Sequence, residues 1–197
     1  MIVIAGGDSM VWGSELADSP NGSPNGYSRR TFTALLAENN QYICAAYPGH
    51  SNYEIAQDLR TAIKETTGIP FVIACWTWPS RDKTYTSNRV IKEFEHYCKY
   101  HGIPYLFTCV DNHMFEVVDS TKLDMSNWYF FPPAEETYNT QTPRGFYQWA
   151  VENKYNVGPE FHPLEDAHRD AAELIRSKFN ELVEKFNQQN QIRNSLS

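Results

Sequence analysis

The sequence has no apolar run long enough to span a bilayer, no C-x-x-C pair and no cluster of basic residues. The first absence excludes a transmembrane helix, and the apolar stretch 1–5 is too short for a secretion signal. The formal net charge is −7, and Arg29-Arg30 is the only adjacent pair of basic residues. Because nucleic-acid binding needs clustered Lys and Arg, we expect no nucleic-acid partner. Because neither a transmembrane helix nor a secretion signal is expected, we also expect no membrane partner and a cytoplasmic location.

Cysteine is scarce, and its four copies are widely spaced at Cys44, Cys75, Cys98 and Cys109. This spacing does not match the ligand pairs of a zinc site. Since most of these residues lie in or beside apolar runs, we expect buried, reduced thiols that act as small core residues. We therefore predict no metal site.

Linkers and repeats are also lacking, so the 197 residues suit one domain with its own core. We expect this domain to cover residues 1–188, with a polar, flexible tail at 189–197. Residues 110–160 are rich in aromatic and polar side chains. A long segment of this kind inside a compact domain indicates an insertion or a lid.

Short apolar runs alternate with stretches of helical periodicity through the rest of the chain. Strands are predicted at 1–5, 41–46, 70–76 and 103–109, and helices at 28–39, 51–66, 84–101, 143–153 and about 163–187. Strands that are apolar on both faces, alternating with helices, predict an α/β domain with a parallel sheet. Functional residues of such folds follow the carboxyl ends of the strands.

The first predicted strand ends in Gly6-Gly7-Asp8-Ser9. A strand-to-helix turn can hold a serine toward solvent, and its backbone N–H groups can face a developing oxyanion. A serine nucleophile needs a general base. Histidine is present at the far end of the chain, in GPEFHPLEDAHRDAA, where the last predicted helix begins.

Three motifs together resemble the SGNH (GDSL) hydrolase family. They are the stretch Gly7–Gly13 (GDSMVWG), Gly49 after the second strand, and His162-Pro163 with His168 six residues later. The resemblance touches both ends and the middle of the chain. It implies a single-domain, three-layer α/β/α, flavodoxin-like fold with a parallel sheet of four to five strands. The implied activity is that of a serine esterase.

The resemblance also implies roles for individual residues. Ser9 is the expected nucleophile and His162 the expected base, and the N–H groups of Ser9 and Gly49 are expected to donate to the oxyanion. Asp8 is expected to support the turn. No metal or organic cofactor is implied, and the expected substrate is a small acyl ester or an acylated carbohydrate.

Two positions depart from the family pattern. Trp78 stands where the family's third block has an oxyanion-hole asparagine, so Thr77, Ser80 and Arg81 are the candidates for a replacement donor. Pro159 stands where the family often has an aspartate before the histidine. Glu160 is the predicted orienting carboxylate; a Ser-His dyad and an acid elsewhere, such as Asp166, stay open.

The missing asparagine also favours a second hypothesis, a binding or virion module on the same fold with weakened or lost catalysis. Its partners would be a virion, a host glycan or a second copy of the chain. Among the remaining candidates, His168 is predicted to be a structural core residue. Trp76 and Trp78 are the predicted stacking residues, and the other aromatic residues at 128–131 and 146–149 are predicted to form the core of the lid.

Overall fold

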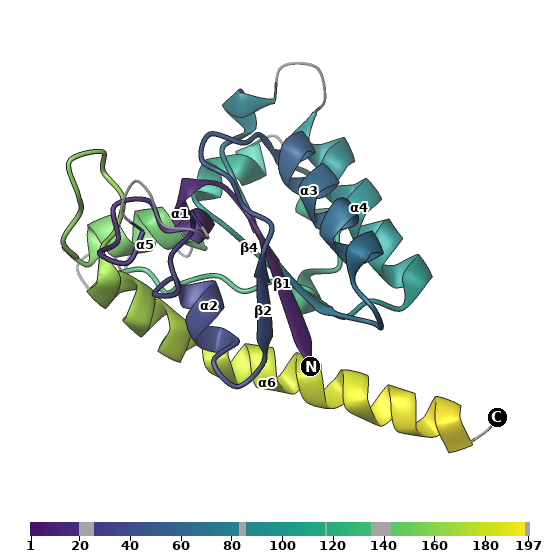
Figure 1. The fold of residues 1–197 in the computed structure, drawn as a ribbon. Coiled ribbons are helices and arrows are strands. Elements are labelled where there is room, and N and C mark those ends of the chain that lie inside the picture. Colours follow the sequence, from purple (N-terminus) through teal and green to yellow (C-terminus); the bar gives the residue numbers. More distant parts are fainter. Residues whose placement is uncertain (20–25, 83–85, 117, 135–142, 196–197) are drawn as a thin grey trace.

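The computed structural model describes residues 1–19, 26–82, 86–116, 118–134 and 143–195. Within these ranges the chain forms an α/β fold around one parallel sheet (Figure 1). The strands are β1 (Ile2–Gly6), β2 (Gln41–Cys44), β3 (Phe71–Trp76) and β4 (Tyr105–Cys109), in the order β2-β1-β3-β4. This matches the start of the flavodoxin-like strand order, in which β2 is added on one side of β1 and the later strands on the other side.

Each strand is apolar on both faces because helices cover the sheet from two sides. Val3, Ile73 and Leu106 pack with α2 (Phe32–Leu36), α5 (Phe146–Glu152) and α6 (Glu165–Ser195). Ile4, Val72 and Phe107 pack with α3 (Asn52–Glu65) and α4 (Ser87–His101) on the other side. The predicted three-layer arrangement is therefore confirmed, with one core on each face of the sheet.

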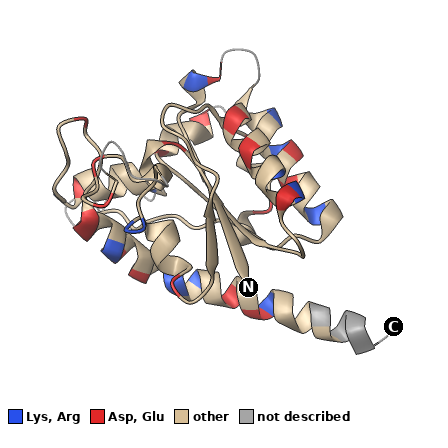
Figure 2. Ribbon diagram, in the orientation of Figure 1, with Lys and Arg blue, Asp and Glu red and all other residues tan. Residues whose placement is uncertain are grey.

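Charged residues lie on the helices and not on the strands. The four strands contain no charged residue, whereas acidic and basic residues are interspersed along the helices, most visibly on α4 and α6 (Figure 2). None of the helices in the described part of the chain is long and apolar enough to cross a bilayer. All four cysteines are free thiols, and three of them are buried, as expected for core residues.

The helix predicted at 28–39 is much shorter in the structure. Ser28, the first residue of the predicted helix, donates its hydroxyl hydrogen to Asp18 and accepts from the backbone N–H of Arg30 at 2.9 Å. It thus forms a turn, and Thr31 caps α2 by accepting from Ala34 N–H. Local side-chain hydrogen bonds have displaced the helix start by competing for the same backbone groups.

At the carboxyl end of the chain the helix is longer than predicted. α6 continues to Ser195, beyond the expected end at about residue 187, and its last turns project past the sheet (Figure 1). Part of the predicted tail at 189–197 is thus helical, and its flexibility stays a prediction.

The aromatic-rich region 110–160 consists of short helices that pack onto the sheet, with residues 117 and 135–142 outside the described part. The described segments are α5 and the 3₁₀ helices η2 (Asn112–Glu116), η3 (Ser120–Lys122) and η4 (Met125–Asn127). Trp128, Phe131, Phe146 and Trp149 are buried. These aromatic residues complete the two cores, which supports their predicted role as packing residues.

Candidate active site

Ser9 stands at the first position of the short helix α1 (Ser9–Trp12), directly after β1. Asp8 caps this helix by accepting from Met10 N–H at 3.0 Å. The turn needs glycine at position 7, because a Cβ there would lie 2.4 Å from Val11. Ser9 is 6% exposed. The sequence therefore places a nearly buried hydroxyl at the carboxyl edge of the sheet, next to a tightly packed backbone.

Asp8 connects this turn to β3. Its carboxylate is fully buried, and Oδ2 accepts from the Thr77 hydroxyl at 2.7 Å and from Nη1 of Arg81 at 2.8 Å. Nη1 of Arg81 also donates to the His50 carbonyl at 3.4 Å, and its guanidinium lies 5.0 Å from the ring centroid of Trp78. Arg81 thus compensates a buried charge and joins the ends of β1, β2 and β3.

The three candidates for a replacement oxyanion donor are therefore in different situations. The only hydroxyl hydrogen of Thr77 is donated to Asp8, so Thr77 is committed to the turn and is not free to face an oxyanion. Arg81 retains further N–H groups in addition to those on Nη1. Ser80 is exposed and lies outside this network.

A second buried side chain, which the sequence analysis did not single out, holds the end of β3. Asn52 is fully buried; it accepts from Thr77 N–H at 2.8 Å and donates to the Thr77 carbonyl at 3.0 Å. It also donates to the Ser87 hydroxyl at 3.0 Å. Its amide pairs with both backbone groups of Thr77, as the backbone of a neighbouring strand would. This holds Thr77 in place, and the Thr77 hydroxyl donates to Asp8.

Gly49 lies in the loop after β2 with φ +82°, a left-handed conformation that favours glycine. The loop is attached to the nucleophile turn, because Tyr47 N–H donates to the Gly7 carbonyl at 3.2 Å. The neighbouring His50 ring contacts Asp58 at 2.7 Å. The loop that the family resemblance assigns to the oxyanion hole is therefore hydrogen-bonded to the turn that carries Ser9.

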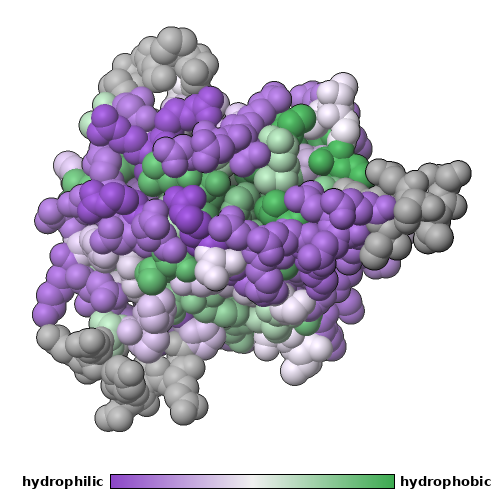
Figure 3. All heavy atoms as spheres, turned by 90° about the horizontal axis from the view of Figure 1, so that it is seen from below, coloured by the Kyte–Doolittle hydropathy of each residue, from purple (hydrophilic) through white to green (hydrophobic). Residues whose placement is uncertain are grey.

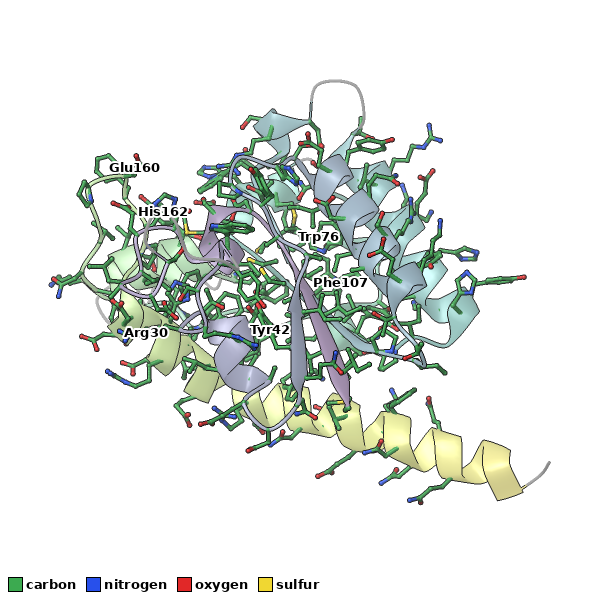
Figure 4. All side chains as sticks on the ribbon, in the orientation of Figure 1. Arg30, Tyr42, Trp76, Phe107, Glu160 and His162 are labelled. Carbon is green, nitrogen blue, oxygen red and sulfur yellow. The ribbon has the colours of Figure 1, made fainter. Side chains whose placement is uncertain are left out.

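His162 is held by a carboxylate from the other end of the chain. Its Nδ1 lies 2.8 Å from Oε2 of Glu15, and its backbone N–H donates to the same oxygen at 3.2 Å. Glu15 follows α1, and Ser14 N–H donates to the Ser9 carbonyl at 3.0 Å. The carboxylate that anchors the histidine is thus only six residues after Ser9 in sequence, and His162 lies near α1 (Figure 4).

The prediction that Glu160 is the partner of His162 is wrong. The side chain of Glu160 is exposed, and only its backbone participates, donating N–H to Glu15 Oε1 at 3.0 Å. Figure 4 shows Glu160 further out on the same loop than His162. No pattern of spacing pointed to Glu15, because a contact between residues 15 and 162 depends on the tertiary fold.

The backbone around this pair is strained. Glu15 has φ +68° and Phe161 has φ +64°, and neither is a glycine. The left-handed conformation costs about 1–2 kcal/mol for a residue with a Cβ, and it persists only where surrounding contacts enforce it. One strained residue is Glu15 itself and the other directly precedes His162, so the strain lies at this contact, as is typical of functional sites.

Burial raises the pKa of the Glu15 carboxyl, but hydrogen bonds from the Glu160 backbone and from the His162 ring and backbone outweigh this effect. The net result is a pKa below the usual value for glutamate. Glu15 is thus a carboxylate at neutral pH and accepts the Nδ1 hydrogen of His162. Nε2 is the ring nitrogen left to exchange protons.

His168 is a core residue, as predicted. It is 1% exposed, and its Nδ1 accepts from Phe32 N–H at 3.1 Å. Burial lowers its pKa to about 3, and the nearby His162 adds to this effect. A permanently neutral, buried ring that joins α6 to α2 does not act as the base.

A cavity of about 520 Å³ opens at the same edge of the sheet. It is lined by Trp78, Pro79, Ser80, His113 and Glu116, which follow β3 and β4. Trp76, by contrast, is fully buried against Phe94 and Phe107, so the prediction that it stacks on a ligand is wrong. Asp111 accepts from His113 N–H at 2.9 Å, which forms an Asx turn after β4.

Among the described residues, no group of three or more histidines, cysteines or carboxylates is arranged to hold a metal ion. The chemistry available at this edge is that of a serine, an imidazole paired with a carboxylate, backbone N–H groups and one arginine. Such a set can carry out acyl transfer.

No protein-family model matches the sequence, and no curated protein sequence matches it. The fold is similar to that of the psychrotrophic esterase EstA from Pseudoalteromonas sp., in a structure inhibited by monoethylphosphonate. That comparison has a TM-score of 0.53 and 12% identity, and it covers 95% of this chain and 98% of EstA. A mutant of the esterase AlinE4 gives a TM-score of 0.42 at 15% identity over 64% of each chain.

Proposed function

We propose that the protein is a serine hydrolase that cleaves small acyl esters. The observation that carries this proposal is the Glu15–His162 contact of 2.8 Å beside the helix that begins with Ser9. The similarity in fold to the esterase EstA supports it. The SGNH type of this hydrolase rests on the sequence motifs at Ser9, Gly49 and His162.

In this mechanism Ser9 Oγ attacks the acyl carbon while Nε2 of His162 takes the hydroxyl proton. Glu15 holds the imidazole by Nδ1 and stabilises the imidazolium that forms. His162 then gives the proton to the departing alcohol, which leaves an ester between Ser9 and the acyl group. Water, deprotonated by His162, hydrolyses that ester and releases the acid.

The tetrahedral intermediates carry a negative charge on the former carbonyl oxygen. The Ser9 and Gly49 N–H groups are the proposed donors, since their two loops are joined by the Tyr47–Gly7 hydrogen bond. Arg81 is the proposed third donor in place of the family's asparagine. Its Nη1 already binds both the Asp8 carboxylate and the His50 carbonyl, so the guanidinium lies between these two loops.

The direct test is labelling with a fluorophosphonate probe, followed by mass spectrometry of the modified peptide. We expect the label on Ser9. We also expect Ser9→Ala to reduce the hydrolysis of p-nitrophenyl acetate by a factor of about 10³ or more. Ser14→Ala is the matched control, and it should keep the wild-type rate and melting temperature.

Two results would overturn the proposal. Hydrolysis that survives in Ser9→Ala would show that another residue is the nucleophile. Absence of both labelling and hydrolysis in the folded wild-type protein would favour the binding or virion module instead.

A further inference from the structure

Helix α6 packs on the sheet through one apolar stripe and presents a polar side outward. The stripe consists of Ala167, Ala171, Ile175, Phe179 and Leu182, which are all buried. Seen from below, the side along which α6 runs, the surface is mainly hydrophilic (Figure 3). Apolar packing has no preferred direction, whereas hydrogen bonds do. The orientation of the first turn of α6, directly after the loop that carries His162, therefore depends on its polar contacts.

Glu165, the first residue of α6, joins this turn to the segment that carries Glu15. Its Oε1 accepts from the backbone N–H of Ala17 at 2.8 Å and lies 3.5 Å from Nη1 of Arg30. Glu165 follows His162 by three residues, and Ala17 follows Glu15 by two. The Glu165–Ala17 hydrogen bond thus connects the same two segments of the chain as the Glu15–His162 contact.

The two carboxylates bind in opposite directions. Glu15, on the segment after α1, accepts from the backbone N–H groups of Glu160 and His162 at 3.0 Å and 3.2 Å. Glu165, on α6, accepts in return from the backbone of Ala17. Hydrogen bonds from N–H groups to a carboxylate are about twice as strong as those between neutral groups. A shift of one segment relative to the other would weaken both sets of bonds at once.

Glu15 depends on such a restraint because its backbone is strained, with φ +68°. A left-handed residue with a side chain persists only where surrounding contacts enforce it. The N–H groups of Ser14 and Leu16 donate to carbonyls within residues 9–13, which are close by in the chain. The N–H of Ala17, in contrast, donates to a side chain from the far end of the chain. Through this bond α6 restrains the backbone next to Glu15.

The ion pair with Arg30 is the weaker part of this contact. The side chains of Arg30 and Glu165 are 54% and 32% exposed, and their charged atoms lie 3.5 Å apart. An exposed ion pair of this kind contributes little to stability. The hydrogen bond from Ala17 is shorter, and it needs an acceptor oxygen but no charge.

We propose that Glu165 is a positioning residue for catalysis. By holding Ala17 it keeps the Glu15 carboxylate on Nδ1 of His162, and it does so without touching the reacting atoms. The inference rests on the proposed function for the roles of Glu15 and His162. It adds to that pair a second carboxylate, which fixes the two chain segments that the pair connects.

The test uses two substitutions of the same residue. Glu165→Ala removes the acceptor, whereas Glu165→Gln keeps an acceptor oxygen on a side chain of equal length. We expect Glu165→Ala to lower kcat for p-nitrophenyl acetate by about tenfold or more, with KM within about twofold of the wild-type value, because a misplaced histidine loses alignment with Ser9. Glu165→Gln should keep at least about half of the wild-type kcat.

Asp166→Ala is the matched control. Asp166 is the next residue, also acidic and in the first turn of α6, but its side chain is 63% exposed and pairs with Arg169 at 2.8 Å. This variant removes a carboxylate from the same helix end and leaves the Ala17 bond intact, so its kcat should stay at the wild-type value. An equal loss of kcat in Asp166→Ala and Glu165→Ala would overturn the inference. An equal loss in Glu165→Gln and Glu165→Ala would also overturn it.

A spectroscopic measurement separates this inference from the proposed catalysis. In protein labelled with ¹⁵N-histidine, the ring nitrogen shifts report the tautomer of His162, and His162→Gln assigns its signals. We expect one tautomer, with the hydrogen on Nδ1, in the wild type and in Glu165→Gln, and a mixture of tautomers in Glu165→Ala. This pattern supports the positioning role even if the wild type hydrolyses no ester. Ester hydrolysis with unchanged shifts and kcat in Glu165→Ala would refute the role and leave the esterase standing.

Discussion

Glu15 receives hydrogen bonds from two directions, and its carboxylate has little room to move. The donors belong to Glu160 and His162. The Glu15 carboxylate also lies against Gly158, where an added Cβ would be 2.5 Å from it. The Gly158 N–H in turn donates to the His162 carbonyl at 2.9 Å. The loop that carries His162 is therefore shaped around this one side chain.

Replacing Glu15 should separate its role from that of Glu160. We expect Glu15→Gln to lower kcat for p-nitrophenyl acetate by about a hundredfold or more, because an amide no longer fixes the tautomer of His162. In ¹H NMR spectra, the downfield resonance of the His162 Nδ1 hydrogen should disappear at the same time.

Glu160→Gln is the control, since only its backbone N–H contacts Glu15. Its kcat should stay within about twofold of the wild-type value, which corresponds to less than 0.5 kcal/mol. The opposite order of effects would restore Glu160 as the orienting residue.

At the scale of elements, the site depends on how the start of α3 meets the end of β3. Ser51 caps α3 in a capping box with Glu54, so the next residue, Asn52, is fixed at the first turn. Its amide then satisfies both backbone groups of Thr77. This contact replaces the hydrogen bonds that a strand loses where it leaves the sheet.

Removing that amide should destabilise the protein. Asn52→Ala leaves the N–H and the carbonyl of Thr77 buried without these partners, at a cost of about 2–4 kcal/mol in the free energy of unfolding. Urea denaturation monitored by tryptophan fluorescence measures this change. Asn156→Ala, at an exposed position, should change it by less than about 0.5 kcal/mol; equal effects in the two variants would contradict the role of Asn52.

At the scale of the whole molecule, His168 joins the first and last parts of the chain. It lies on α6, accepts from the backbone of Phe32 in α2, and stacks on the Phe32 ring at 6.0 Å. Since burial lowers its pKa to about 3 from 6.5, the folded state binds fewer protons than the unfolded state between these values. Its contribution to stability is present above pH 6.5 and is lost as the pH falls toward 3.

We therefore expect the free energy of unfolding to decrease as the pH is lowered from 6.5 to 4.5. His168→Gln cannot titrate, so the decrease over this interval should be smaller in that variant, although its stability at pH 7 will also be lower. His101→Gln, at an exposed position of α4, should keep the wild-type slope. Equal slopes for the His168 variant and the wild type would show that another group controls acid stability.

The sequence by itself determined the features that depend on neighbouring residues and on periodicity. Doubly apolar strands such as Phe71–Trp76 can be stable only between two layers of helices, which defined the α/β class. The Gly-Gly-Asp-Ser turn and the His162-Pro163 helix start were likewise recognisable, because each is set by a few adjacent residues.

Tertiary structure alone decided which side chains complete the site. Glu15 rather than Glu160 binds His162, because residues 15 and 162 meet only when the loop before α6 packs against the segment after α1, and no spacing in the chain encodes that meeting. Asn52 and Thr77 come together for the same reason, across the junction of α3 and β3. Hydrogen bonds act over about 3 Å in space whatever the separation in sequence, so the partners of a catalytic residue follow from the packing of whole elements.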